Sequence, residues 1–190
     1  FDAEPQLMVG YHKPNYPDPD AYVFSVIANI LRDSGNSSRL YRRLVQTGIA
    51  SDVAVYEELP GQRYTNLFVL HASPAAPHTT GEVEEILYSE LDSLARVPVS
   101  EAELTKCKNQ LEASYIREIS DNNSLAQALA RAQAIHGDWR VVTEHRANVS
   151  KVTADDVMRV ARLYFKPQNR TVAAIVRENG QNNGRGREDQ

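Results

Sequence analysis

Short segments in which apolar residues alternate are separated by much longer segments with helical periodicity, and this order constrains the fold more than any other feature of the sequence. Alternation is typical of a strand with one buried face, whereas apolar residues three or four positions apart are typical of an amphipathic helix. The chain therefore combines a sheet with several helices. The predicted strands are residues 6–13, 52–56, 65–71 and 171–176.

Local signals indicate where these elements begin and end. Pro60-Gly61 lies between the second and third predicted strands, so these strands are expected to form an antiparallel hairpin. A helix is expected to begin at Asp18, which precedes Pro19 as a cap, and to run to Arg32. Further helices are expected at residues 39–47, after Thr79, after Ser100, over 125–135, around 139–147 and after Thr153.

Two of the predicted helix starts have the spacing of a capping box, in which the cap residue and an acidic residue three positions later bond to each other's backbone. These pairs are Thr79 with Glu82 and Ser100 with Glu103. One later helix has a stripe containing small alanines, which favours close approach to a neighbouring helix. That stripe is Leu125, Ala128, Leu129, Ala132 and Ile135.

The order of the elements favours an α+β fold, with a mainly antiparallel sheet and helices packed on one of its faces. The length of 190 residues and the apolar fraction of 42% are sufficient for one domain with its own core. We expect residues 1–177 to form this domain. Residues 178–190 are polar and rich in Gly and Asn, and they are expected to form a flexible tail.

Composition excludes several classes of protein. The 21 Lys and Arg against 25 Asp and Glu give a net charge of −4, which disfavours nucleic acid as a partner. A single cysteine forms no intrachain disulfide, and no apolar run is long enough to span a membrane. The segment is expected to be soluble, and it carries no targeting signal from which a compartment could be assigned. Its start at Phe1 is consistent with an excised or processed piece.

Catalytic and metal-binding motifs are missing from the sequence. There is no GxGxxG, GxxxxGK[ST], GxSxG or HExxH motif, and the five histidines are scattered. Glu144-His145 resembles the end of an HxxEH motif, but Val141 stands where the first ligand would be, and valine offers no lone pair. We therefore expect Glu144-His145 to be an exposed helix surface. Cys107 is in phase with apolar helix residues, so a core position is expected.

Two segments resemble those of a known family. Residues 35–44, Gly-Asn-Ser-Ser-Arg-Leu-Tyr-Arg-Arg-Leu, resemble the G-x-x-S-R-L-x-x-x-L segment of the M16 (pitrilysin/insulinase) metallopeptidases. Residues 157–176, with Tyr164-Phe165, Pro167 and Asn169-Arg170-Thr171, resemble the YFxPxNRTVxxxV ending of domains in that family. The resemblance extends over roughly residues 5 to 177.

The resemblance implies a fold and a pairing of two domains with different functions. Domains of this family have the α+β fold of the LuxS/MPP-like metallohydrolases and occur as homologous pairs that enclose an extended peptide. One domain of a pair carries an HxxEH zinc motif with a distal glutamate, and the other lacks metal ligands. Because HxxEH is missing here, the resemblance implies the second, non-catalytic type, with no cofactor in this chain and zinc on the partner domain.

The family pattern also identifies candidate site residues. In active pairs the second domain supplies an Arg and a Tyr from a segment like L-R-x-K-x-x-L-x-Y. Here Val45 and Ser51 occupy those places, and neither replaces the charge or the reach of the family residue. Arg42, Arg43 or Tyr56 would substitute from a shifted register; alternatively, the two arginines are simply solvated on a short helix.

Three functional hypotheses follow. The first is the metal-free half of an M16-like zinc metallopeptidase, forming one wall of a peptide-enclosing chamber. Its zinc-bearing partner would be part of the same parent chain or a separate subunit, and this chain alone would not hydrolyse peptides. The second is a non-proteolytic scaffold or assembly subunit of the same fold. The third is a module that binds an extended peptide at a sheet edge.

Overall fold

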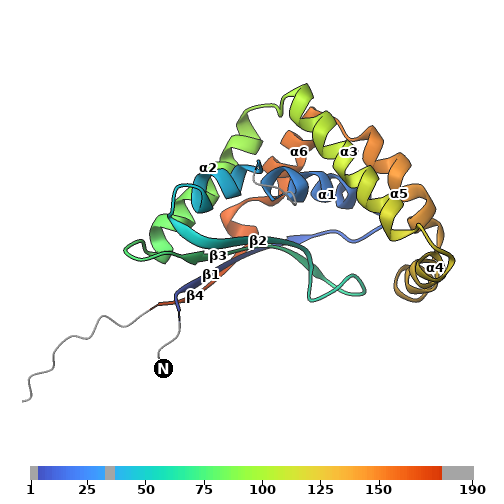
Figure 1. Cartoon of the computed structure of the whole chain (residues 1–190), viewed down its shortest axis with the longest axis horizontal. Helices are drawn as coiled ribbons and strands as arrows, with labels where there is room; N and C mark the ends of the chain where they lie inside the picture. The colour runs from blue at the N-terminus through green and yellow to red at the C-terminus, as the bar shows by residue number, and fades with distance from the viewer. Residues whose placement is uncertain (1–3, 33–36, 177–190) are drawn as a thin grey trace, which may run out of the picture.

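In the described chain, helices cover one face of a four-stranded antiparallel sheet, with one helix beside the end of the sheet, and the other face of the sheet is open (Figure 1). The computed structural model describes residues 4–32 and 37–176. The predicted α+β fold is confirmed. Its elements are β1 (Gln6–Lys13), α1 (Pro19–Leu31), the π-helical turn η1 (Tyr41–Val45), β2 (Ala50–Leu59), β3 (Asn66–Pro74), α2 (Thr80–Arg96), α3 (Glu101–Glu118), α4 (Asn122–His136), α5 (Arg140–Lys151), α6 (Ala154–Tyr164), the 3₁₀ turn η2 (Pro167–Asn169) and β4 (Arg170–Ile175).

The strand order is β2-β3-β1-β4, so the predicted hairpin β2–β3 is confirmed and the two ends of the domain pair with each other. Leu7 and Val9 of β1 are fully buried, and they lie opposite Ala72 and Leu70 of β3. On its other side β1 pairs with β4. Since side chains alternate across a strand, Met8 points to the opposite face, where 38% of its surface is exposed.

The helix starts were predicted well where the signal is local. The Asp18 carboxylate accepts a hydrogen bond from the backbone N–H of Asp20 at 2.8 Å. Thr79 and Glu82 form the predicted capping box. The Ser100 side chain accepts a hydrogen bond from the backbone N–H of Glu103, as predicted. The second predicted bond, from the Ser100 backbone to the Glu103 carboxylate, is wrong, because that carboxylate pairs with a distant arginine instead.

That arginine, Arg39, belongs to the segment that resembles the SRL motif, and it joins three elements. Its guanidinium donates to both oxygens of Glu103 on α3, at 2.9 and 2.7 Å, and lies 4.0 Å from Glu90 of α2. The neighbouring Leu40 and Leu44 are fully buried. The segment therefore anchors η1 to the helical layer. The first two residues of the motif, 35 and 36, lie outside the described residues.

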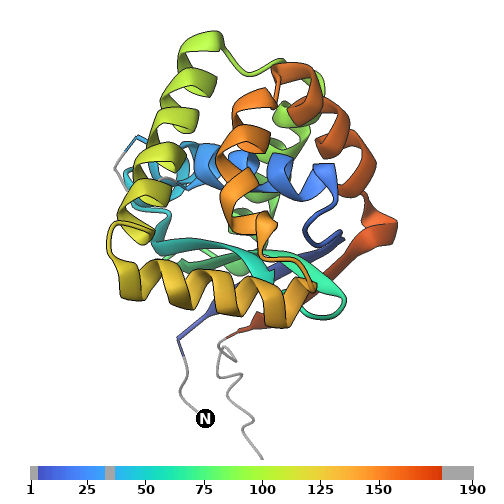
Figure 2. The ribbon, with the colours of Figure 1, turned by 90° about the vertical axis from the view of Figure 1, so that its right-hand side faces the viewer.

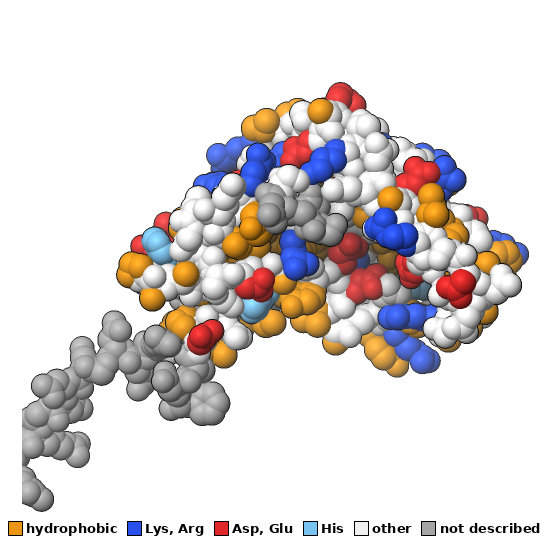
Figure 3. Space-filling model, in the orientation of Figure 1, with side chains coloured by type: hydrophobic (Ala, Val, Ile, Leu, Met, Phe, Trp, Pro, Cys, Tyr) orange, Lys and Arg blue, Asp and Glu red, His pale blue; other side chains and the backbone are white. Residues whose placement is uncertain are grey.

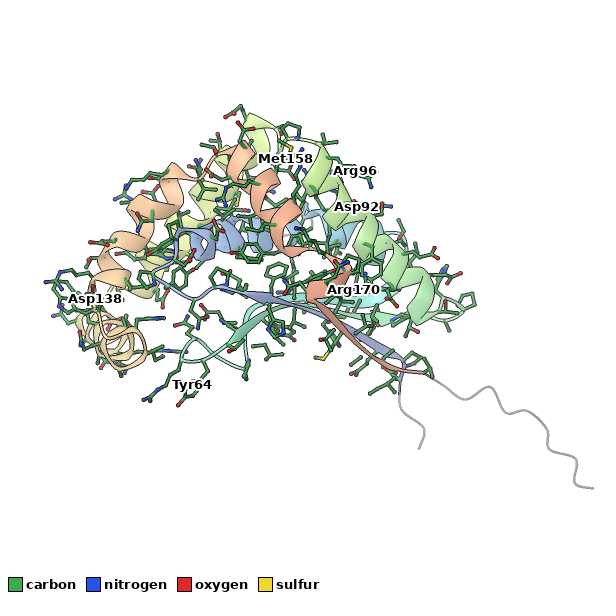
Figure 4. The ribbon with its side chains drawn as sticks, turned by 180° about the vertical axis from the view of Figure 1, so that it is seen from behind. Tyr64, Asp92, Arg96, Asp138, Met158 and Arg170 are labelled. Atoms are coloured by element: carbon green, nitrogen blue, oxygen red, sulfur yellow. The ribbon has the colours of Figure 1, made fainter. Side chains whose placement is uncertain are left out.

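The second motif has a structural role as well. The Asn169 amide donates to the carbonyl oxygens of His12 and Tyr164, both at 2.9 Å, and so ties the end of α6 to β1. Arg170 lies with its guanidinium 4.1 Å from the ring centroid of Tyr88 on α2, between the sheet and the helical layer (Figure 4). These contacts fix the start of β4.

Aromatic rings join the sheet to the helical layer at what we term the aromatic junction: Tyr11, Phe24, Phe68, Tyr164 and Phe165. The Phe24 ring of α1 lies 5.3 Å from Phe68 of β3 and 5.2 Å from Tyr164 at the end of α6. Phe165 contacts Tyr11 of β1 at 5.1 Å. Such edge and tilted contacts add to the burial of large apolar surface.

Other predicted boundaries and positions came out as follows. The predicted helix at 39–47 is mostly a π-helical turn, and it ends as expected at Gly48, which has a φ of +77°. The helix predicted around 139–147 is α5, which continues to Lys151. Cys107 is buried, as predicted. The predicted tail at 178–190 lies outside the described residues.

Replacing Phe24 with Ala removes the ring shared by the sheet, α1 and α6. We expect Phe24→Ala to lower the free energy of unfolding by about 3–5 kcal/mol, through lost burial and a cavity. Tyr64→Ala is the control, because the Tyr64 side chain is 73% exposed at the end of the β2–β3 hairpin (Figure 4); its change should stay within about 0.5 kcal/mol. Urea denaturation of both variants measures the difference, and equal effects would contradict the role of the junction.

Candidate functional site

A cavity of about 620 Å³ separates the β2 side of the sheet from the helices α3, α4 and α5, and we term it the helix–sheet cavity. In Figure 2, α3 and α5 stand above α4, which runs crosswise beside the β2–β3 hairpin. Figure 3 shows acidic side chains in a hollow between the helical layer and the sheet. The lining residues used below are Tyr16, Ser25, Val55, Tyr56, Glu57, Glu58, Gln62, Leu111, Tyr115, Glu118, Ile119, Ala128, Arg131, Ala132, His136, Val142 and His145.

Three hydrogen-bonded side chains in this cavity, Tyr16, Ser25 and Glu57, connect the segment before α1 with α1 and β2. The Ser25 hydroxyl donates to Glu57 Oε2 at 2.7 Å. Because its single proton is used there, the Tyr16 hydroxyl, 2.6 Å from Ser25 Oγ, is the donor in the second bond. Burial raises the pKa of Glu57, and the bond from Ser25 opposes this only in part.

The second carboxylate oxygen of Glu57 is chemically available. No described residue donates a hydrogen bond to Glu57 Oε1, and this atom remains accessible from the cavity that Glu57 lines. The buried ammonium of Lys13 donates to the Pro14 carbonyl at 3.2 Å. It donates no hydrogen bond to Glu57 in the described structure, but its positive charge acts to lower the pKa of Glu57. The cavity therefore contains a carboxylate with one free acceptor.

Aromatic rings line the cavity beside this carboxylate. His145 of α5 lies 5.7 Å from the rings of Tyr16 and Tyr22, and it stacks on Tyr115 of α3 at 6.2 Å. The His136 ring contacts Tyr16 edge-on at 6.1 Å. Burial lowers the pKa of His145, so its neutral form is favoured.

His145 is therefore a residue whose environment was predicted wrongly. Glu144 is exposed, as expected, but His145 is half-buried in the aromatic cluster. A helical repeat alone gives little indication of this, because α5 meets rings from α3 and from the segment before α1. The periodicity of Leu111, Tyr115 and Ile119 did predict an apolar face, although this part of it lines the cavity.

The predicted close approach of α4 to another helix is realised with α5, yet the alanine stripe is only partly covered. Ala132 is 6% exposed, whereas Ala128 is half-buried, and both line the cavity. At the edge of the cavity, Gln62 joins the hairpin to α4. Its amide nitrogen donates to Glu58, and its Oε1 lies 2.9 Å from Nε2 of His136.

The structure does not bring the candidate site residues together at one place. The strand register places the Tyr56 side chain on the face of the sheet opposite the helices, where it is 44% exposed, and the residue also borders the helix–sheet cavity. Arg42 and Arg43 lie on η1, beside a different surface hollow lined by Arg39, Glu90 and Glu103. The Arg43 guanidinium donates to Glu90 at 2.7 Å, while the Arg42 side chain is exposed.

Val45 and Ser51, which stand where the family carries an arginine and a tyrosine, make local structural contacts. Val45 is half-buried against the core. Ser51 is exposed on β2, and its hydroxyl donates to the Ser73 carbonyl at 3.2 Å. Within residues 4–32 and 37–176, no three His, Cys, Asp or Glu side chains are grouped so that they could hold a metal ion. No helix in these same ranges is both long and apolar enough to cross a membrane.

Comparison with known proteins identifies the class to which this fold belongs. A family model described as the peptidase M16 inactive domain matches residues 2–111, which is more than half of the chain. The chain therefore belongs to this family of inactive M16 peptidase domains. The predicted membership of the M16 family is thereby confirmed, and the matched residues include the first of the two motifs, residues 35–44.

Individual relatives agree with this assignment. An uncharacterized zinc protease of Streptomyces coelicolor is 28% identical over 137 residues, which are 72% of this chain and 29% of that protein. A probable mitochondrial-processing peptidase subunit beta of Arabidopsis thaliana is 25% identical over 178 residues, 90% of this chain and 33% of that protein. The chain thus spans about a third of the length of these relatives.

A solved structure of similar extent shows the same fold. The inactive peptidase domain from Bordetella parapertussis superposes with a TM-score of 0.79 and 28% identity. The match covers 93% of this chain and 92% of that one. Four strands with a one-sided layer of helices are therefore the architecture of a domain of this type.

Glu57→Gln tests the electrostatics of the cavity. The folded state raises the pKa of Glu57 above its unfolded value, so it binds that proton more tightly, and wild-type stability falls as the pH rises from the unfolded pKa through the folded pKa. Glutamine removes this penalty and can still accept from Ser25. We expect the variant to melt at a higher temperature than wild type near pH 7, and the advantage to vanish below about pH 4.5.

The measurement is a series of thermal melts of both proteins between about pH 4 and pH 8. The comparison between variant and wild type isolates Glu57 from the exposed carboxylates, which titrate in both proteins. A difference in melting temperature that does not change with pH would contradict the assigned environment.

Proposed function

We propose that this chain is the metal-free half of an M16-like zinc metallopeptidase and forms one wall of a chamber that encloses an extended peptide. A homologous domain bearing HxxEH, in the same parent chain or in a separate subunit, supplies the zinc. This half contributes enclosure and exclusion of water from the reaction. By itself it does not hydrolyse peptides.

The observation that carries the proposal is the open face of the sheet, which we define by the side chains that the strand register places opposite the helical layer: Gln6, Met8, His12, Asp52, Ala54, Tyr56, Leu67, Val69, His71, Thr171, Ala173 and Ile175. Seven of these twelve side chains are apolar or aromatic; Ile175, Tyr56 and Met8 are 46%, 44% and 38% exposed, whereas Ala54 and Val69 are buried. This partly apolar sheet face is the surface against which a partner or a peptide would be enclosed.

The comparisons support the pairing with a zinc-bearing domain. The Streptomyces coelicolor relative is described as a zinc protease, and this chain corresponds to only 29% of its length. The Arabidopsis thaliana relative is described as a subunit, which is the precedent for a partner on a separate chain.

Arg42, Arg43 and Tyr56 remain the proposed substrate contacts of this half. Tyr56 has the better position, because its side chain is on the open face and its phenol is a donor and an acceptor. Arg43 is held by Glu90, so its guanidinium is already engaged. Arg42 would contact a substrate only at the η1 edge of the sheet.

A scaffold or assembly subunit of the same fold is the second candidate. It is favoured by one specific observation, the presence of Val45 and Ser51 at the places where active pairs carry an arginine and a tyrosine. In that case the open face would still bind a homologous domain, but no peptide would be cleaved.

Reconstitution tests the proposal. The chain is combined with the HxxEH-bearing domain encoded in its parent or a neighbouring reading frame, and hydrolysis of a fluorogenic peptide library is followed. We expect the pair to cleave about a hundredfold faster than either part, because enclosure positions the peptide at the zinc. Removal of zinc with a chelator should abolish the activity.

Two variants provide the internal comparison. Met8→Lys places a charge on the open face and should weaken assembly, whereas Leu163→Lys alters a side chain of α6 that is 48% exposed in the helical layer and should not. A complex that forms but never cleaves would favour the scaffold. Zinc-dependent cleavage by this chain alone would overturn the proposal.

A further inference from the structure

We propose that the helix–sheet cavity binds an organic cation, an ammonium or guanidinium group on an aliphatic stem. The cavity lies on the helix side of the sheet, whereas the proposed chamber wall is the open face. The inference does not depend on the proposed function. It is based on three independent features of the cavity: an available carboxylate, aromatic rings beside it, and apolar side chains that lead to it.

The carboxylate is that of Glu57. Its Oε2 accepts from Ser25, so the position of the group is fixed, while Oε1 has no donor among the described residues. A cation brought to Oε1 would form a charge-assisted hydrogen bond in a partly desolvated place, where such a bond is stronger than in water.

The rings favour the same ligand. Tyr16, Tyr115, His136 and His145 line the cavity, and the negative face of an aromatic ring attracts an ammonium or guanidinium. The protein itself uses this attraction at the same ring, because the Lys13 ammonium lies 5.7 Å from the Tyr16 centroid. Lys13 is 7% exposed, so a desolvated cation is already tolerated next to this cluster.

The balance of charge around the cavity disfavours an anion. Among the described lining residues, the carboxylates of Glu57, Glu58 and Glu118 outnumber the single guanidinium, that of Arg131. Glu118 and Arg131 are exposed, whereas Glu57 and Glu58 are half-buried. The inner part of the cavity is therefore the more acidic part.

The walls of the cavity suit an aliphatic stem. Val55, Leu111, Ile119 and Val142 line it, together with Ala128 and Ala132, which leave space because their side chains are small. The volume of about 620 Å³ is within the usual range of small-ligand sites. A butyl or propyl chain with a charged end would bury its stem against these residues and place its charge at Glu57.

Isothermal titration calorimetry with matched probes tests this inference. The free ligand is represented by n-butylguanidinium, and its neutral isostere n-butylurea is the control. A side chain on a peptide is represented by N-acetyl-Ala-Arg-Ala-amide, with the citrulline peptide as its neutral control. We expect each guanidinium probe to bind at least about tenfold more tightly than its neutral control.

The two pairs also distinguish the source of the cation. Tighter binding of the peptide would identify an arginine side chain of an extended chain, and tighter binding of n-butylguanidinium would identify a small free amine or guanidine. Equal binding of charged and neutral probes, or no binding of either guanidinium probe, would overturn the inference.

Variants of the cavity complete the test. Glu57→Gln should weaken guanidinium binding at least about tenfold, and Ala128→Trp should block it by filling the cavity without a change of charge. Glu85→Gln, which removes the same charge from an exposed position on α2, should leave binding unchanged. Thermal melts verify that each variant is folded. Unaltered binding by a folded Glu57→Gln or Ala128→Trp variant would refute the assignment.

Discussion

The contact of Phe24 with Phe68 and Tyr164 is the interaction on which the rest of the structure depends. It joins α1 to the sheet and to the last helix, residues that are 44 and 140 positions apart from Phe24 in the sequence. Phe165, just after α6, contacts Tyr11 and Phe68 of the sheet. These contacts place the chain beside β1, where β4 begins. The pairing of the first and last strands follows from this closure.

The aromatic junction also explains why the two sides of the sheet differ. Large rings and aliphatic residues on one side hold the helical layer, and the alternate positions of the same strands form the open face. At the far end of the helical layer, α3, α4 and α5 stand away from β2, and the helix–sheet cavity occupies the space between (Figure 2). One architecture thus has an uncovered sheet face and, separate from it, a cavity on the side of the helices.

Much of the fold was predictable because its signals are local. Asp18-Pro19 and the Thr79–Glu82 capping box fixed helix starts with residues only a few positions apart, and alternation identified the strands. At Ser100 the helix start was predicted correctly, but the full capping box was not, because Glu103 bonds to Arg39, 64 residues away. A local sequence pattern carries no information about such a distant partner. The two family-like motifs proved to be structural anchors through Arg39 and Asn169.

The cavity could not be predicted for a related physical reason. The periodicity of Leu111 and Tyr115 on α3, or of Ala128 and Ala132 on α4, predicts an apolar face, but it does not predict whether another element fills the space opposite that face. The same applies to His145, whose burial arises from rings on other segments. The roles of Arg42, Arg43 and Tyr56 as substrate contacts stay predictions.

The central claim is that the open face, and not the helical layer, meets the zinc-bearing partner. The two methionines of the chain allow a direct measurement, because Met8 lies on the open face and Met158 lies on α6 in the helical layer (Figure 4). Oxidative labelling of the chain, alone and in the reconstituted pair, is quantified at each methionine by mass spectrometry. The account predicts strong protection of Met8 on assembly with Met158 unchanged; protection of Met158 alone would contradict it.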